Sequence, residues 1–171
     1  MPVKYSGNIA PGMVEALSNL PNLFGMRRMA HPGFGDSILS GLVVTEASVQ
    51  PKAEEPLKEE GRIVCEITVT EDMLNGGGNI HGGCSAFLID VCSTLCLMVY
   101  KPGMHVSQSL NIVYHSPATL GEKLRIVNTS MTVGARAMSA RTEARNAILL
   151  SCHRLVASGV HIKMQPSEAK L

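Results

Sequence analysis

The apolar segment 80–100 constrains the fold more than any other part of the chain. Apart from cysteines and the terminal tyrosine, its only ionisable side chains are those of His81 and Asp90. The apolar residues recur at helical spacing, and a proline-glycine pair follows shortly after as a stop signal. We therefore predict a helix over 82–99 that is too apolar to lie on an open surface. Its isolated carboxylate must be neutralised, hydrogen-bonded or used in chemistry.

The predicted helix has two stripes of side chains. The apolar stripe is expected to pack on a sheet and consists of Cys84, Leu88, Val91, Leu95 and Met98. The second stripe is small or polar and consists of Gly83, Ala86, Asp90, Ser93 and Thr94.

Strand-like segments surround this helix. Two precede it, separated by a charged connection, and four follow it: 41–50, 62–70, 105–115, 122–133, 136–145 and 148–163. This order predicts an α+β domain in which a mostly antiparallel sheet wraps around one long central helix. We divide the chain into an N-terminal helical extension (1–40), this domain (41–164) and a polar tail (165–171). The extension includes a short helix at 9–25, broken near Pro21.

Composition narrows the possible partners. The chain has 171 residues, enough for one domain with a real core, and a net charge of +1. A net charge so close to zero does not indicate binding to nucleic acid or to an acidic membrane surface. The apolar runs are too interrupted for a membrane span. The five cysteines lack metal-ligand spacing, so we interpret them as reduced core thiols and expect no metal site. A small molecule or another copy of the chain is the expected partner.

Gly82 lies at the first turn of the predicted helix, where backbone N–H groups are unpaired and the helix dipole is positive. Such a site can hold a carbonyl oxygen as it becomes negative, and glycine lets a substrate approach closely. The alternative is that the glycines only turn the chain tightly into the helix. His81 is a general base, an orienting group or a helix-capping imidazole, and Asn75 is a turn residue by propensity.

Asp90 is the candidate for activating water or for attacking an electrophilic carbon directly. The alternatives are a core carboxylate paired with an arginine and a partly exposed surface acid, which the apolar flanks disfavour. From Gly82 to Asp90 the helix rises about 12 Å, so one helix cannot bring both groups to the same reacting atom. A second copy, with its helix antiparallel alongside, can do so, and the small-residue stripe allows a close approach. We predict an obligate homodimer with shared active sites at the interface.

The pattern Asn-x5-His-Gly-Gly-x6-Asp at 75–90, followed by Tyr-His-Ser-Pro-Ala at 114–118, resembles a known motif. It is similar to that of the hotdog-fold acyl-CoA thioesterases, especially the phenylacetate-pathway and thioesterase superfamily member 2 types. The similarity runs from about 41 to 163. It implies a hotdog fold, an acyl-CoA substrate, no cofactor and a homotetramer.

The resemblance also implies roles for individual residues. The Gly82 N–H polarises the thioester carbonyl, and Asp90 of the partner chain acts as general base or nucleophile. Asn75, His81 and Ser107 orient the acid, the substrate or water; Ser107 matches the serine that completes the family's site on the next strand. We further expect substrate contacts at Gly83, Tyr114, Ser116, Pro117 and Arg136.

Two other functions stay open at this point. A hotdog enoyl-CoA hydratase or dehydratase also uses His with Asp or Glu at a dimer interface. A non-catalytic acyl-CoA-binding protein would hold the same ligand without reaction.

The last three residues, Ala169-Lys170-Leu171, form a small-basic-leucine end similar to the Ser-Lys-Leu peroxisomal address. We therefore expect a peroxisomal location, with the cytosol and the mitochondrion as alternatives.

Overall fold

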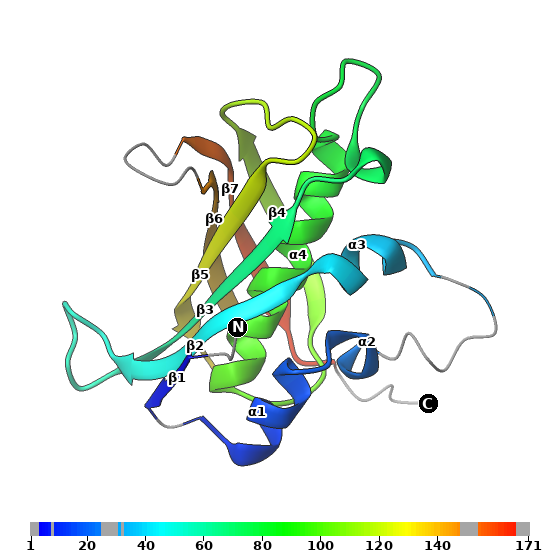
Figure 1. Ribbon diagram of the computed structural model, residues 1–171. Helices are drawn as coiled ribbons and strands as arrows, with labels where there is room; N and C mark the ends of the chain where they lie inside the picture. Colours follow the sequence, from blue (N-terminus) through cyan, green and yellow to red (C-terminus); the bar gives the residue numbers. More distant parts are fainter. Residues whose placement is uncertain (1–3, 8, 25–30, 32, 148–153, 167–171) are drawn as a thin grey trace, which may run out of the picture.

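A long central helix, α4 (Gly82–Tyr100), lies against one curved sheet that wraps around it (Figure 1). The computed structural model describes residues 4–7, 9–24, 31, 33–147 and 154–166. This arrangement confirms the predicted α+β class and the hotdog architecture. The helix begins at the predicted residue and ends one residue beyond the predicted end.

The sheet has seven strands among the described residues. In spatial order they are β1 (Lys4–Gly7), β2 (Val43–Pro51), β3 (Glu59–Thr68), β5 (Lys123–Val133), β6 (Ala137–Asn146), β7 (Leu155–Met164) and β4 (Val106–Tyr114). All neighbouring pairs are antiparallel except β1 and β2, which are parallel. β4 therefore forms one edge of the sheet, and most of its side chains are exposed.

The core lies between α4 and the concave side of the sheet. Leu95, Cys96 and Leu97 are fully buried although they are consecutive, because strands cover the helix on several sides. The apolar stripe packs as predicted, with only Met98 half-buried. In the second stripe Ser93 is fully buried. α4 also has the length and apolarity of a membrane span, but 61% of that window is buried inside the fold, as in the core helix of a globular domain.

The N-terminal region differs from the single broken helix predicted at 9–25. Two short helices form there, α1 (Pro11–Leu17) and α2 (Leu20–Leu23). The break comes at Asn19, whose side chain accepts the Asn22 N–H at 3.3 Å, while Pro21 sits in the first turn of α2, where a missing N–H costs little. β1 was not predicted, and it adds this region to the sheet.

Three further boundaries depart from the sequence prediction. Helix α3 (Asp36–Gly41) occupies the start of the first predicted strand, because the left-handed Gly35 (φ 76°) turns the chain into a helix first. A 3₁₀ turn, η2 (Glu71–Met73), follows β3. The last strand begins at Leu155, and residues 148–153 of the predicted strand lie outside the described residues.

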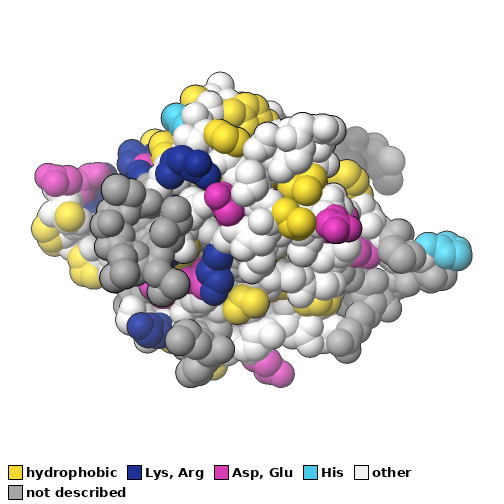
Figure 2. Space-filling view, turned by 45° about the horizontal axis from the view of Figure 1, so that its top comes forward, with side chains coloured by type: hydrophobic (Ala, Val, Ile, Leu, Met, Phe, Trp, Pro, Cys, Tyr) yellow, Lys and Arg dark blue, Asp and Glu magenta, His cyan; other side chains and the backbone are white. Residues whose placement is uncertain are grey.

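The cysteines of the described part of the chain are Cys65, Cys84, Cys92 and Cys96, and all four are free and buried. Cys152 lies outside the described residues. On the surface, basic and acidic side chains lie among one another on the face that Figure 2 shows, in keeping with the low net charge.

Candidate active site

A tight loop leads the chain into α4. The side-chain oxygen of Asn75 accepts the N–H groups of Gly77 at 2.9 Å and Asn79 at 3.3 Å. Gly78, with φ 75°, donates its N–H to the Asn75 carbonyl at 3.0 Å. Asn75 therefore holds the loop in shape, as its turn propensity predicts.

His81 caps the N-terminus of α4. Its Nδ1 accepts the Gly83 N–H at 2.9 Å. A Cβ on Gly83 would lie 3.0 Å from this nitrogen, so the missing side chain leaves room for the imidazole. Of the three roles open for His81, the structure shows the capping one, and the other two stay predictions.

Gly82 is the first residue of α4, where an N–H has no acceptor within the helix. Its carbonyl oxygen accepts the Tyr114 hydroxyl at 3.1 Å, and the phenol ring lies beside the Gly82 backbone. A cavity of about 380 Å³ opens here, lined by Asn75, Gly82, Tyr114, Ser116 and Pro117 among others. We call it the Gly82 cavity. It brings together five of the residues predicted from the sequence.

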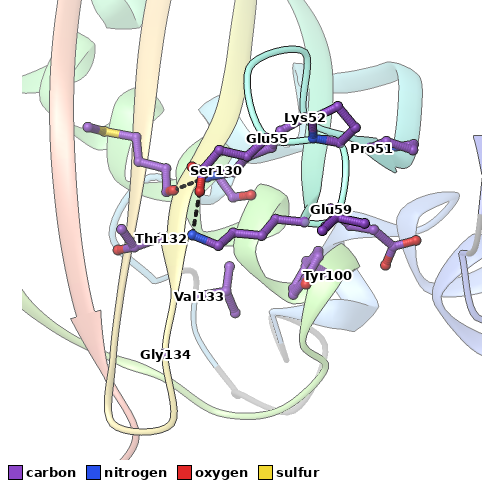
Figure 3. Close-up of a pocket in the computed structure, with 13 residues that line it drawn as sticks. Pro51, Lys52, Glu55, Glu59, Tyr100, Ser130, Thr132, Val133 and Gly134 are labelled. Carbon is purple, nitrogen blue, oxygen red and sulfur yellow. Dashed lines mark hydrogen bonds and ion pairs between the residues drawn. The ribbon is translucent and has the colours of Figure 1, made fainter.

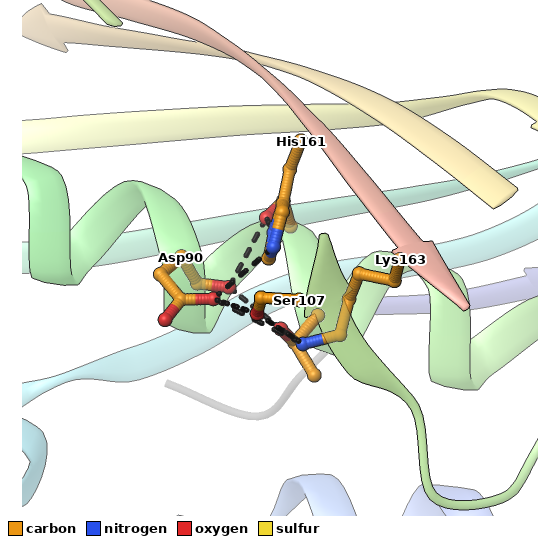
Figure 4. Close-up of polar contacts among 6 residues, drawn as sticks. Asp90, Ser107, His161 and Lys163 are labelled. Atoms are coloured by element: carbon orange, nitrogen blue, oxygen red, sulfur yellow. Dashed lines mark hydrogen bonds and ion pairs between the residues drawn. The ribbon is translucent and has the colours of Figure 1, made fainter. Parts of the chain in front are cut away.

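Asp90 lies further along α4 in a polar cluster drawn from three elements (Figure 4). Its Oδ1 accepts the Ser107 hydroxyl of β4 at 3.4 Å. From β7, the Nε2 of His161 lies 3.5 Å away and the Nζ of Lys163 3.9 Å away. The Asp90 side chain is 43% exposed, so the carboxylate faces solvent on one side and polar partners on the other.

The two ring nitrogens of His161 face different groups. Nδ1 lies 2.7 Å from the Ser93 hydroxyl, which donates to the Asp90 carbonyl at 3.1 Å, and the same carbonyl accepts the Thr94 hydroxyl at 2.7 Å. Nε2 is buried and has no hydrogen bond within standard geometry in the described chain, so the carboxylate is its nearest partner.

The electrostatics of this cluster follow from burial. His161 is fully buried, and desolvation, with a contribution from Lys163, lowers its pKa below the ordinary 6.5, while Asp90 opposes the shift. Burial also lowers the pKa of Lys163, again opposed by Asp90. His161 is therefore neutral at neutral pH.

A second cavity adjoins Asp90. It measures about 350 Å³ and is lined by residues of α2, α4, the connection after α4, and β7: Leu23, Phe24, Asp90, Val91, Thr94, Met98, Gly103, Met104, His105 and Lys163. We call it the Asp90 cavity. Most of its side chains are apolar, so it can accommodate a hydrocarbon group next to the carboxylate.

The two cavities share no lining residue. Gly82 lines one and Asp90 the other, as expected from their separation of about 12 Å along the helix. Within one protomer the structure does not bring the predicted carbonyl-binding and base groups together. Arg136 is also apart: it lies exposed in the turn between β5 and β6 and lines neither cavity.

Comparisons with known proteins show the family of this chain. Residues 77–152 match the sequence profile of the thioesterase superfamily. Acyl-coenzyme A thioesterase 13 of Homo sapiens is 35% identical over 104 residues, which are 60% of this chain and 72% of that protein. The Mus musculus protein of the same name is 32% identical over 133 residues, 77% of this chain and 84% of that one. The chain belongs to the thioesterase superfamily.

Solved structures of the thioesterase superfamily share the fold. Zebrafish thioesterase superfamily member 2 superposes with a TM-score of 0.68 at 31% identity, covering 86% of this chain and 96% of that one. The PaaI protein of the E. coli phenylacetic acid degradation operon has a TM-score of 0.56 at 22% identity, covering 62% and 73%. The latter shows the fold alone. The family resemblance stated from the motif is confirmed.

A further cavity of this thioesterase-superfamily chain lies elsewhere. It measures about 860 Å³ and lies between the charged β2–β3 connection and the end of β5 (Figure 3). The ammonium of Lys52 crosses it to the Met131 carbonyl at 2.7 Å. No residue predicted for the site lines it. Among the described residues no group of His, Cys, Asp and Glu could hold a metal ion.

Sequence reasoning missed His161 and Lys163. Along β7 the inward positions 157, 159, 161 and 163 are Ala, Gly, His and Lys, while apolar Val160 and Ile162 point outward. A prediction from hydrophobic alternation would place Val160 and Ile162 inside the fold and His161 and Lys163 outside it, which is the reverse of the structure. The sequence did contain one indication of these two residues: the Asp90 carboxylate on α4 needs polar partners on the strand that covers it.

Proposed function

We propose that this chain hydrolyses acyl-coenzyme A thioesters to a free acid and coenzyme A. The observation that supports this best is the Asp90 carboxylate, held at Oδ1 by Ser107 and faced by a neutral His161, beside an apolar cavity. The names of the related acyl-coenzyme A thioesterases supply the substrate class. The reaction needs no cofactor.

The chemistry assigned to Asp90 is base or nucleophilic catalysis. As a base, its carboxylate takes a proton while the water oxygen bonds to the thioester carbon; collapse then breaks the C–S bond, and the coenzyme A sulfur receives the proton. As a nucleophile, the carboxylate itself attacks that carbon, the C–S bond breaks, and coenzyme A leaves as a thiolate that takes up a proton. Water later cleaves the resulting mixed anhydride, which releases the free acid and restores the carboxylate. In either case the carbonyl oxygen gains negative charge, which the Gly82 N–H at the helix N-terminus can stabilise.

The site requires two protomers. Because Gly82 and Asp90 line separate cavities, a second copy must supply the missing group. The edge strand β4 supports this, because no other described strand pairs with its outer edge. Apolar side chains on it and on the adjacent strand are exposed, namely Val106, Val113, Tyr114 and Ile162. We propose a homodimer with two shared sites, and its pairing into a homotetramer.

The apolar walls of the Asp90 cavity favour a hydrocarbon acyl group, fatty or aryl, and thus a place in lipid metabolism. The C-terminal tripeptide 169–171 lies outside the described residues. Its small-basic-leucine sequence supports a peroxisomal location, where acyl-CoA esters are handled.

An assay with three readouts separates the possible functions. Purified protein is incubated with an acyl-CoA and a thiol-specific chromogen, and in parallel with a trans-2-enoyl-CoA whose conjugated absorbance is followed. A thioesterase releases free coenzyme A from the saturated substrate. A hydratase changes only the enoyl absorbance, and a binding protein does neither while still retaining acyl-CoA on gel filtration. Either of the last two outcomes would overturn the proposal.

A further inference from the structure

A buried lysine of β7 belongs to the Asp90 cluster and has polar partners there. Lys163 is 5% exposed, yet its Nζ lies 2.9 Å from the Thr94 hydroxyl, 3.2 Å from the Ser107 hydroxyl and 3.9 Å from the Asp90 Oδ1. Burying an ammonium is expensive unless its protons are hydrogen-bonded. Here the partners come from α4 and from β4, so one side chain connects three elements (Figure 4).

Counting protons fixes the direction of these hydrogen bonds. An ammonium has three protons and no lone pair, so Lys163 can only donate. Thr94 donates its own proton to the Asp90 carbonyl at 2.7 Å and therefore accepts from Lys163. Ser107 likewise accepts from Lys163, which leaves its single proton to point at the Asp90 Oδ1.

The backbone also supports this arrangement. Ser107 is the β4 partner of Lys163 in the β4–β7 ladder, and the register shifts between Ser107 and Ser109. Such a bulge re-aims side chains and is frequent beside active sites. All polar contacts to the carboxylate from described residues reach Oδ1, namely those of Ser107, His161 and Lys163.

We propose that Lys163 is a positioning residue for the thioesterase reaction. Its ammonium holds Ser107 as a donor to Oδ1 of Asp90 and leaves Oδ2 as the oxygen that meets water or the thioester. The inference rests on the proposed function of Asp90.

The groups that face the Asp90 carboxylate differ in charge. From β7 it is faced by His161 and Lys163, from β4 by the uncharged Ser107, and from the connection after α4 by His105, which lines the same cavity. Burial lowers the pKa of both histidines, so both are uncharged at neutral pH. Among the described groups of this cluster, Lys163 is the one that carries a positive charge.

The test compares Lys163→Met, which keeps length and apolar packing, with Lys101→Met, which removes a half-buried lysine bonded to turn carbonyls. Lys163→Met should lower kcat by about tenfold to a hundredfold with KM little changed, because a group that aligns the reacting carboxylate is lost. A purely structural loss would not divide the effect between kcat and KM in this way. Lys101→Met should behave like the wild type in both kcat and KM.

A double-mutant cycle shows whether Lys163 acts through Ser107. If it does, adding Lys163→Met to Ser107→Ala should lower kcat far less than it does in the wild-type background. Should Lys163→Met fail to fold by circular dichroism, Lys163→Gln, which is also uncharged, replaces it in the cycle, and the same dependence on Ser107 is expected.

An unchanged kcat in Lys163→Met, or losses that simply multiply in the cycle, would overturn the inference while leaving the hydrolase proposal intact. A wild-type protein that releases no coenzyme A would instead overturn the proposed function.

Discussion

The carboxylate of Asp90 is half-exposed on a helix whose other side chains are mostly buried, and it is the one acid of that helix. Asp90→Asn keeps the size of the side chain and removes its capacity to accept a proton. We expect turnover to fall by about two to four orders of magnitude, the usual scale for a lost catalytic acid or base. The measurement is coenzyme A release, with gel filtration to show that the oligomeric state persists.

The matched control is Asp36→Asn in α3. The Asp36 carboxylate accepts the Gly33 N–H at 2.6 Å, and an asparagine oxygen can accept it as well. This variant should retain wild-type turnover. Equal activity of the two variants would contradict the role of Asp90.

His161 should make stability depend on pH. Its pKa is lower in the folded chain, mainly through burial, so the unfolded chain takes up a proton more readily. The stabilising contribution is complete above the unfolded value near 6.5 and is lost as pH falls through that value toward the folded one. The free energy of unfolding in urea should therefore decrease from neutral to mildly acidic pH.

His161→Gln removes this titration and should give a shallower pH dependence. Part of the slope should remain, because the pKa of His105 is also lowered by burial and by nearby lysines. A slope identical to that of the wild type would show that His161 is not responsible.

At the residue scale, the sequence points to Asp90 and Gly82 because each breaks a local pattern: an acid in an apolar run, and a glycine at a helix start. Ser107 was found only through the family resemblance. His161 and Lys163 could not be found locally, since their burial depends on which face of β7 meets α4, and that is decided by pairing between distant segments.

At the scale of elements, the contact between β3 and the C-terminal half of α4 is unusually close. A Cβ on Gly61 would lie 2.8 Å from the Cys96 carbonyl oxygen and 3.2 Å from the Tyr100 Cβ. Gly61→Ala must therefore push the strand from the helix, at a cost of about 1–3 kcal/mol. Urea unfolding measures this cost as a lower midpoint.

Gly76→Ala is the control for that substitution. A Cβ there meets nothing within 4 Å, so the midpoint should be unchanged or slightly higher. If Gly61→Ala unfolds at the same urea concentration as the wild type, the close packing of β3 on α4 is not a constraint on the fold.

Elements with strong local signals were predicted well, and those that depend on distant partners were not. The predicted segment 122–133 matches β5 (Lys123–Val133) to one residue, because β-branched residues and flanking turns mark it. β1 has four residues and exists through its parallel pairing with β2, about forty positions later in the chain. From composition, Gly61 was assigned to the charged connection between the first two predicted strands. In the structure it lies in the contact between β3 and α4.

At the scale of the whole molecule, the separation of the two cavities predicts complementation between defective subunits. The double variant Asn75→Ala/Gly82→Pro and the variant Asp90→Asn should each be inactive alone. When their subunits exchange, one of the two sites in each mixed dimer has every wild-type group, and activity should return. Native mass spectrometry verifies the mixed dimers; if they form without activity, the site lies within one chain.

The C-terminal tripeptide predicts a location for the molecule. A fluorescent protein fused ahead of residues 160–171 should appear in punctate organelles with a peroxisomal marker, because import receptors read a free terminal tripeptide. Deleting Ala169-Lys170-Leu171 should release the full-length protein to the cytosol without a change in catalysis. A diffuse or mitochondrial signal from the intact protein would refute the address.

The buried thiols give the molecule an internal reporter. Burial raises the pKa of Cys84 to about 11 and that of Cys96 further, and a hydrogen bond to Cys92 together with burial raises that of Cys65. Neutral, covered thiols react with a chromogen only after the surrounding structure opens. In the absence of substrate, the rate at which these thiols react with the chromogen therefore measures how fast α4 separates from β3. The same cuvette measures catalysis.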